Sequence, residues 1–146
     1  MYKNILIPTD GSALSRKAAA HGVKLAKLVG ASVIGFYAAP PATPLEYRGL
    51  LPGYIDPQKH ARAIEEATAR YLAVIESAAK AAGVPCKTMS VTDDFPADAI
   101  LAAAKKHDCD LIFIASHGHR GSRASMLGSE AQKVLAQSTV PVLVDR

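Results

Sequence analysis

Short apolar runs alternate along the chain with longer segments in which apolar residues recur every three or four positions. The short runs predict five buried strands, at residues 4–7, 31–37, 86–91, 110–115 and 140–144. The segments between them predict helices from the turn at residues 10–12 to about 29, at about 58–82, from 96 to about 106, and at 130–137. A run too short for a helix is typical of a strand, whereas a 3.6-residue period is typical of a helix with one buried face.

Residues with a preference for helix ends stand where the pattern changes. Asp10 and Ser12 follow the first strand, and a side-chain oxygen of either residue can accept hydrogen bonds from first-turn amides as an N-cap. Gly30 and Gly83 follow the first two helices, where a left-handed residue commonly ends a helix. Pro96 suits the first turn of the third helix.

The alternation of strands and helices determines the predicted fold class. Strand–helix–strand units join parallel strands by right-handed crossovers, so the sheet is expected to be parallel and covered by helices on both faces. A chain of 146 residues without internal repeats or a domain-scale linker is expected to form a single α/β domain.

Composition and charge limit the classes of binding partner that we expect. The net charge of +4 comes from lysines spread over several segments without interleaved aromatic residues, so nucleic-acid binding is not expected. No run approaches the roughly 18 apolar residues of a membrane span, and the N-terminus leads into a strand without a secretory pattern. Cys86 and Cys109 are too far apart for a CxxC motif, so we expect two reduced thiols in a cytoplasmic protein that does not bind membranes.

Residues 38–57 form the one long segment without a helix or strand pattern, and they contain five prolines. A loop of this length in a compact domain is usually functional or disordered. It also contains several leucine, tyrosine and isoleucine residues, which is too much apolar surface for a free linker. We expect it to pack over the mouth of a ligand site or against a partner, and the sequence leaves both open.

A polar loop, ASHGHRGSRASMLGS at residues 115–129, connects the fourth strand to the fourth helix. It contains no Asp or Glu, while Arg120 and Arg123 stand in it together with His117 and His119. Glycine-bearing loops between a strand and a helix bind phosphate in many α/β proteins, through backbone N–H groups and the helix N-terminus. The first hypothesis is therefore an anion-binding site.

The glycines of this loop leave two interpretations open. Nine residues separate Gly118 from Gly128-Ser129, so the loop can bend back and direct these amides and the Ser129 hydroxyl at one anion. A flexible surface loop is the alternative. The chain has neither a P-loop signature nor a dinucleotide-binding G-x-G-x-x-G after the first strand, which counts against P-loop enzymes and nicotinamide dehydrogenases.

Asp10 also has two interpretations. It lies just beyond the carboxyl end of the first strand, beside the expected switch point of the sheet, where ligands of open α/β folds bind. In the first interpretation it caps the first helix. In the second it accepts hydrogen bonds from a ribose hydroxyl or helps to hold a metal. His117 and His119 resemble half of a metal site, but no carboxylate or Cys nearby completes it, so no metal ligand is assigned. No serine has the partners of a hydrolase triad, and no catalytic residue is assigned.

Three segments in this order resemble the universal stress protein family: ILIPTDGS at residues 5–12, ASHG-x9-GS at 115–129, and PVLVDR at 141–146. The resemblance covers essentially the whole chain. It implies one nucleotide-binding domain over residues 1–146, with an open, Rossmann-like parallel sheet of strand order 3-2-1-4-5 and helices on both faces. It also implies a homodimer and, for a subset of the family, ATP binding.

The ATP-binding subset is marked by G-x2-G-x9-G-[ST], which carries over to this chain residue by residue. The implied nucleotide site consists of Pro8, Thr9, Asp10, Ala38, Ala115, His117, Gly118, Arg120, Gly128 and Ser129. The glycines and the serine would hold the phosphates, Asp10 would lie near the ribose and phosphates, and the backbone at the ends of strands one and two would contact the adenine. The chain departs from the motif at its first position, where Ala115 replaces glycine. The methyl group would crowd the ribose if that backbone needs a positive φ, and would be harmless otherwise.

These features predict a cytoplasmic, ATP-binding regulator of a stress response, with Mg²⁺ as a further component and at most slow ATP hydrolysis. The expected partners are an adenine nucleotide, an unknown client protein and a second copy of the chain. Strand 140–144 is expected at the sheet edge, where an apolar strand invites antiparallel pairing with its own copy. The alternative is a nucleotide-independent dimeric interaction module of the same fold.

Overall fold

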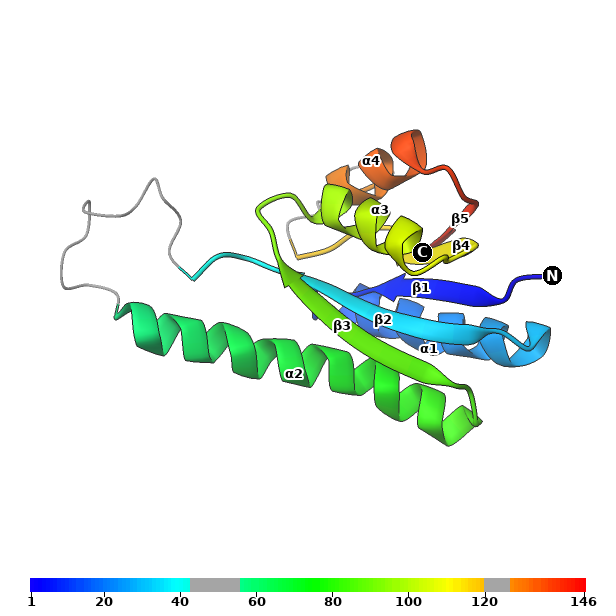
Figure 1. The fold of residues 1–146 in the computed structure, drawn as a ribbon, viewed down its shortest axis with the longest axis horizontal. Helices are drawn as coiled ribbons and strands as arrows, with labels where there is room; N and C mark the ends of the chain where they lie inside the picture. The colour runs from blue at the N-terminus through cyan, green and yellow to red at the C-terminus, as the bar shows by residue number, and fades with distance from the viewer. Residues whose placement is uncertain (43–55, 120–126) are drawn as a thin grey trace.

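The computed structural model describes residues 1–42, 56–119 and 127–146, in which five strands alternate with four helices (Figure 1). In chain order these are β1 (Asn4–Pro8), α1 (Ala13–Val29), β2 (Ser32–Ala39), α2 (Pro57–Ala82), β3 (Cys86–Thr92), α3 (Pro96–Lys106), β4 (Leu111–Ala115), α4 (Ser129–Gln137) and β5 (Val142–Asp145). Every predicted strand and helix is present, with small shifts at its ends. In these ranges no helix combines the length and the apolarity needed to cross a bilayer.

The start of β5 differs from the predicted strand by two residues. Val140 and Pro141 precede the strand, because the Ser138 hydroxyl holds Val140 in a turn: Oγ donates to the Val140 carbonyl at 2.7 Å and accepts from its amide at 3.1 Å. Pro141 has no amide to donate to a ladder, but its carbonyl accepts from Ile112 at 3.0 Å. The strand therefore begins two residues later than the hydrophobic pattern indicates.

The five strands form one parallel sheet in the order β3-β2-β1-β4-β5, which confirms the predicted topology. β1 lies at the centre, between β2 and β4. Its residues Ile5, Leu6 and Ile7 have no exposed surface. A strand paired on both edges and covered on both faces has no solvent-facing side, which explains why its sequence is a continuous apolar run rather than an alternating one.

The helices cover the sheet in two layers, α1 and α2 on one face and α3 and α4 on the other (Figure 1). Alternate side chains of β1 serve the two cores, since Ile5 and Ile7 contact the α1–α2 side and Leu6 contacts the α3–α4 side. Small residues let α1 approach the sheet closely. A Cβ on Gly22 would lie 2.7 Å from Ile7 Cδ1, so the absence of a side chain there sets the depth to which this helix packs.

The Asp110 carboxylate joins the amino ends of β1 and β4. Its oxygens accept from the amide of Lys3, at 2.8 and 3.1 Å, and from the amide of Asn4 at 3.0 Å. The Asp110 amide in turn donates to the Asn4 carbonyl at 3.0 Å. Because these hydrogen bonds join the two segments just before the first ladder pair, Ile5 with Leu111, the carboxylate extends the β1–β4 pairing beyond the end of the ladder.

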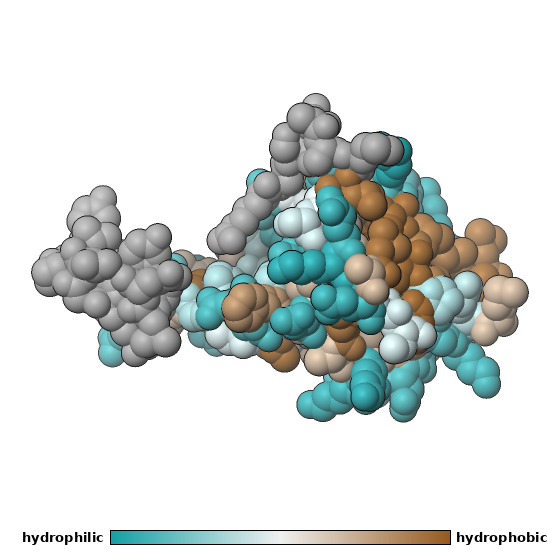
Figure 2. All heavy atoms as spheres, turned by 90° about the horizontal axis from the view of Figure 1, so that it is seen from above, coloured by the Kyte–Doolittle hydropathy of each residue, from teal (hydrophilic) through white to brown (hydrophobic). Residues whose placement is uncertain are grey.

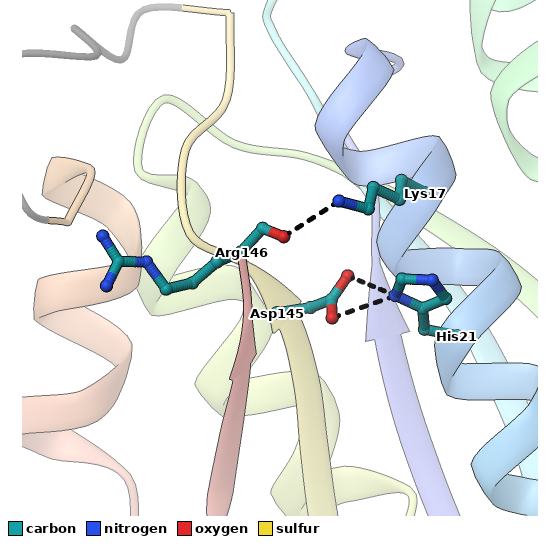
Figure 3. Close-up of polar contacts among 4 residues, drawn as sticks. All are labelled: Lys17, His21, Asp145 and Arg146. Atoms are coloured by element: carbon teal, nitrogen blue, oxygen red, sulfur yellow. Dashed lines mark hydrogen bonds and ion pairs between the residues drawn. The ribbon is translucent and has the colours of Figure 1, made fainter.

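The end of β5 is fastened to the outer surface of α1 (Figure 3). His21 Nδ1 donates to the Asp145 carboxylate at 2.9 and 3.0 Å, and Lys17 Nζ donates to the Arg146 carbonyl at 3.1 Å. Both α1 residues lie one turn apart on the same face, so the helix reaches across β4 and holds the terminal strand by two side chains.

We predict that Asp110→Ala lowers the free energy of unfolding by about 1–3 kcal/mol, because the amides of Lys3 and Asn4 lose a charged acceptor. Asp94→Ala, at an exposed aspartate in the turn before α3, is the control and should change stability by less than about 0.5 kcal/mol. Urea denaturation of both variants measures the difference. Equal stability of the two variants would show that Asp110 does not support the β1–β4 pairing.

Candidate functional site

The sheet has its switch point between β1 and β4. The chain leaves β1 toward β2 on one side and returns from β3 to β4 on the other, so the loops after β1 and β4 diverge to opposite faces. Figure 1 shows both loops at the same end of the sheet. The crevice beyond such a switch point is where ligands of open α/β folds bind, because no helix crosses it.

A network of hydroxyl groups shapes the turn after β1. The Thr9 amide donates to the Phe36 carbonyl at 2.9 Å, and Thr9 Oγ1 accepts from the Gly11 amide at 3.1 Å. The same hydroxyl lies 3.0 Å from Ser15 Oγ, which donates to the Ser12 carbonyl at 2.9 Å. Gly11 has a φ of +81°, a conformation that glycine adopts at little cost. The Thr9 side chain is buried in this turn, where its hydroxyl is used by the hydrogen bonds of the turn.

The N-cap of α1 is Ser12. Its Oγ accepts from the Ser15 amide at 3.2 Å, which is the hydrogen bond expected between an N-cap and the third residue of the helix. The interpretation of Asp10 as the cap of α1 is thus wrong, since Ser12 fills that role. The Asp10 carboxylate is directed elsewhere.

Asp10 connects the two loops of the crevice. Its Oδ1 accepts from the Ser12 amide at 2.9 Å, and its Oδ2 accepts from the His119 amide in the loop after β4 at 2.8 Å. Burial by itself raises the pKa of this carboxyl, but the hydrogen bonds from Ser12 and His119 and the positive charge of a protonated His119 outweigh burial, so the net pKa lies below its usual 3.8. The side chain is an anion at neutral pH, held by one amide from each loop.

Close backbone approach accounts for both glycines of the loop after β4. A Cβ on Gly118 would overlap the Asp10 carboxylate. A Cβ on Gly128 would lie 3.0 Å from the Ser116 carbonyl, to which the Gly128 amide donates at 2.7 Å. Neither glycine has a positive φ, and Gly128 is extended at −68°. These positions therefore require a small residue because space is short, and not because of a left-handed backbone.

The N-terminus of α4 lies at this loop. Its N-cap is Gly128, which has no side chain to accept from the first-turn amides, and Ser129 is exposed. The carboxylate of Glu130 turns away to the start of α3, where Oε2 accepts from the Ala97 amide at 2.8 Å. This contact fixes α3 and α4 relative to each other. It also holds the acidic side chain of Glu130 at the start of α3.

Several predicted site residues come together here: Asp10 contacts the loop at Gly118, and Gly128 lies against Ser116 and His117. Pro8 ends β1, and Ala38 stands one residue before the end of β2, with its side chain against the α3–α4 core. His117 Nδ1 lies 3.0 Å from Ser116 Oγ. Arg120 and Arg123 lie outside the described residues, as does most of the proline-rich segment.

Ala115 is the last residue of β4 and is only 7% exposed. Its methyl group belongs to the core on the α1–α2 side, and its φ is not positive. The methyl group is expected to crowd a ligand only where the backbone needs a positive φ. This condition is therefore not met. Alanine is compatible with the strand and adds buried apolar surface.

Other chemistries find little support in the described ranges. No three His, Cys, Asp or Glu side chains of these residues come close enough to hold a metal ion. Both cysteines are free thiols. Burial, with the charges of Asp110 and Asp108, raises the pKa of Cys109 to about 11, and burial raises that of Cys86 as well. Because only the thiolate is strongly nucleophilic, neither thiol is suited to covalent catalysis at neutral pH.

Two grooves lie away from Asp10. One of about 450 Å³, between the C-terminal ends of α3 and α4, is lined by residues that include Leu101, Lys105, Cys109 and Val140. The other, of about 260 Å³, lies between α2 and the ends of β2 and β3. None of the predicted site residues that the structure describes lines either groove. The features that mark the crevice as a candidate site are therefore its hydrogen bonds and its close glycine contacts.

An open α/β sheet with a glycine-bearing loop and a helix N-terminus at its switch point defines a class of proteins suited to anionic ligands. The universal stress protein family model matches residues 1–146, and the chain belongs to this family. Universal stress protein MJ0531 of Methanocaldococcus jannaschii is 32% identical over 144 residues, which are 99% of this chain and 82% of that protein. A universal stress protein of Thermus aquaticus is 32% identical over 146 residues, with all of both chains covered.

Solved structures match the fold over nearly the whole chain. The hypothetical protein MJ0577 superimposes with a TM-score of 0.80 and 25% identity, covering 99% of this chain and 95% of that one. Some neighbours were solved with adenine nucleotides. A universal stress protein of Archaeoglobus fulgidus with dAMP has a TM-score of 0.66 and 18% identity, covering 99% and 98% of the two chains. One of Arabidopsis thaliana with AMP has a TM-score of 0.68 and 13% identity, covering 97% and 90%.

Sequence reasoning missed the residues that shape the site without facing it. Ser15 and Ser116 are buried hydroxyl residues, and Glu130 connects α4 to α3. Tyr71 is not among the predicted site residues, yet its ring lies against Gly11. Ser15 carried a signal, because a serine in the first turn of a helix commonly bonds to local backbone. The contacts of Tyr71 and Glu130 join residues far apart in the chain, and no local pattern predicts them.

The lowered pKa of Asp10 predicts a pH-dependent contribution to stability. Because the folded pKa lies below the usual 3.8, the stabilisation is present above that value and is lost as the pH falls through the folded pKa. We expect Asp10→Asn to be less stable than the wild type by about 1 kcal/mol at pH 7, with the difference closing at acid pH. Thermal unfolding of both proteins from pH 7 to pH 2 measures it, with Asp94→Asn as the control. A difference that stays constant over this range would contradict the prediction.

Proposed function

We propose that this chain binds an adenine nucleotide, ATP, in the crevice between the loops after β1 and β4, and acts as a nucleotide-dependent regulator. The observation that carries the proposal is the hydrogen bond from the His119 amide to Asp10, which holds the two halves of the predicted site together. Relatives that were solved with AMP, dAMP and cAMP support the class of ligand. The proposal treats residues 1–146 as one nucleotide-binding domain.

The phosphates would lie at the start of α4. The Ser129 hydroxyl and the first-turn amides of the helix are suited to an anion, because Gly128 leaves the amides without a side-chain cap and the helix dipole is positive at this end. Gly118 would let the backbone approach the phosphates from the other side. His117 and Arg120 would supply further positive charge.

The ribose would lie near Asp10. Each carboxylate oxygen accepts one backbone amide and retains a second lone pair, which can accept from a ribose hydroxyl. The adenine would contact the backbone of Pro8, Thr9 and Ala38 at the ends of β1 and β2. Ala115 would lie beneath the ribose as part of the strand, with its methyl group in the core.

Regulation fits the site better than rapid catalysis. The Asp10 carboxylate is already hydrogen-bonded by two amides and is an anion of lowered pKa, so it is a poor general base for activating water. Mg²⁺ would enter with the phosphates, where its role would be to balance their charge. We therefore propose at most slow ATP hydrolysis. A cytoplasmic location and an unknown client protein stay predictions from the sequence.

The test is a binding measurement with matched variants. Calorimetry of the wild type with ATP should show binding, and Gly128→Val should weaken it at least about tenfold, since the new side chain meets the Ser116 carbonyl and fills the anion's space. Ala136→Val, at an exposed position near the other end of α4, is the control and should keep the wild-type affinity. A folded Gly128→Val protein with unchanged affinity would remove the phosphate assignment.

Failure of the wild type to bind ATP, AMP or cAMP would favour the alternative, a nucleotide-independent interaction module. Release of nucleotide from protein purified without added ligand would count for the proposal. Ala115→Gly provides a further check. It should leave affinity unchanged or higher while lowering stability by about 1 kcal/mol, because a buried methyl group is lost.

We also propose a homodimer that forms through β5. Among the described strands this one is at the sheet edge and pairs with β4 alone, and Leu143 on it is 38% exposed. Figure 2 looks onto the side of the molecule that carries α3 and α4 and shows a hydrophobic area there. On α4, Leu135 is 41% exposed. Val142 and Val144 face the α3–α4 side, so Leu143 between them lies on the opposite face, and apolar surface flanks the edge strand on both sides. Such an edge strand is suited to a two-fold contact with a second copy.

Leu143→Lys tests the dimer. Val142 and Val144 are poorer targets, because both side chains pack against the core on the α3–α4 side and a lysine there would disturb folding. The wild type should be dimeric at micromolar concentration by light scattering, and Leu143→Lys should be monomeric with little change in melting temperature. Leu28→Lys, at an exposed leucine of α1, is the control and should stay dimeric. A monomeric wild type, or a dimeric Leu143→Lys, would contradict the proposed interface.

A further inference from the structure

The ring of Tyr71, in the middle of α2, lies against the turn after β1. A Cβ on Gly11 would overlap three carbon atoms of this ring, so the ring touches the turn at a point that only a glycine leaves open. Gly11 also has a φ of +81°. A side chain at this position would be both strained and obstructed, and the turn is therefore closely matched to the aromatic surface beneath it.

Two neighbours hold the Tyr71 ring in place. Tyr37, on β2, meets it edge to face, with ring centroids 5.2 Å apart and an interplanar angle of 86°. The Arg70 guanidinium lies 6.0 Å from the centre of the ring. Edge-to-face pairs and cation–π contacts both depend on orientation, so the ring has a defined position rather than a general apolar environment.

The turn that Tyr71 supports is the one that directs Asp10. Asp10 precedes Gly11, and its Oδ1 accepts from the Ser12 amide on the other side of the glycine. Its second oxygen accepts from the His119 amide across the crevice at 2.8 Å. A change in the backbone at Gly11 therefore rotates the carboxylate and alters its reach to the opposite loop.

We propose that Tyr71 is a positioning residue for the candidate site: its ring holds the Gly11 turn so that the Asp10 carboxylate meets the His119 amide and keeps the two loops together. The ring acts through the turn and does not touch a ligand. The effect on nucleotide affinity rests on the proposed function, whereas the effect on the hydrogen bond between Asp10 and His119 does not. The two parts can therefore be tested separately.

The first experiment uses the protein without nucleotide. Amide hydrogen exchange at Ser12 and His119, measured by NMR, should speed up about fivefold or more in Tyr71→Leu, since both amides donate to Asp10. Tyr71→Phe keeps the ring and should match the wild type. Tyr2→Leu is the control, because Tyr2 is a partly buried tyrosine that packs on the α1–α2 core near the N-terminus.

Unchanged exchange at both amides in a folded Tyr71→Leu protein would overturn the proposal. An equal effect of Tyr2→Leu would also overturn it, because the effect would then follow from general loss of stability. Should Tyr71→Leu fail to fold, Gly11→Ala perturbs the same contact from the other side. It should speed up exchange at the two amides more than Gly30→Ala does, because Gly30 has a similar positive φ but its Cβ would meet no neighbouring atom. An equal effect of the two variants would overturn the proposal.

The second experiment measures ATP affinity by calorimetry in a double-mutant cycle. Tyr71→Leu should weaken binding about fivefold in the wild type and much less in an Asp10→Ala background, because the ring acts through that carboxylate. Additive losses would overturn positioning through Asp10 and indicate a direct contact. A wild type that binds no adenine nucleotide would refute the proposed function, and the exchange measurement would still decide the role of Tyr71.

Discussion

The pairing of β1 with β4 at the centre of the sheet is the interaction on which the rest of the structure depends. The ladder between them is short, since only Ile5 with Leu111 and Leu6 with Ile112 are matched in register. An aspartate extends the pairing at each end: Asp110 accepts amides of β1 at the amino end, and Asp10 accepts the His119 amide at the carboxyl end. The two carboxylates thus connect the ends of β1 and β4, whereas ladder hydrogen bonds connect the middle of the two strands.

The same pairing builds the candidate site. Strands β1 and β4 lie side by side but lead to opposite faces, and their loops separate at the point where Asp10 connects them. The small residues of the loops follow from this closeness, because a side chain on Gly118 would occupy the space of the Asp10 carboxylate. The residues that join the loops are therefore among those that the sequence predicts for the ligand site.

Support for the site comes from residues that lie behind it. Thr9, Ser12 and Ser15 hold the turn after β1 from the side of α1, and Tyr71 holds it from the side of α2. Glu130 sets the start of α4 by its hydrogen bond to the Ala97 amide of α3. Loops supported in this way bind with less ordering on association, which is how a site on loops attains a defined geometry.

The sequence by itself determined the strands, the helices and their order, because buried strands and one-sided helices leave periodic apolar patterns that depend on local geometry. It also predicted Asp10, Gly118 and Gly128-Ser129 as candidate site residues, because Asp10 follows the first strand and the glycines stand in the polar loop before the fourth helix. Only the tertiary structure decided that Ser12 caps α1, that Asp10 bonds to His119, that Ala115 belongs to the core, and that Tyr71 lies under Gly11. Apart from the Ser12 cap, which is local, these contacts join segments far apart in the chain. Which long-range partner a side chain meets depends on how the layers pack, and no pattern within one segment contains that information.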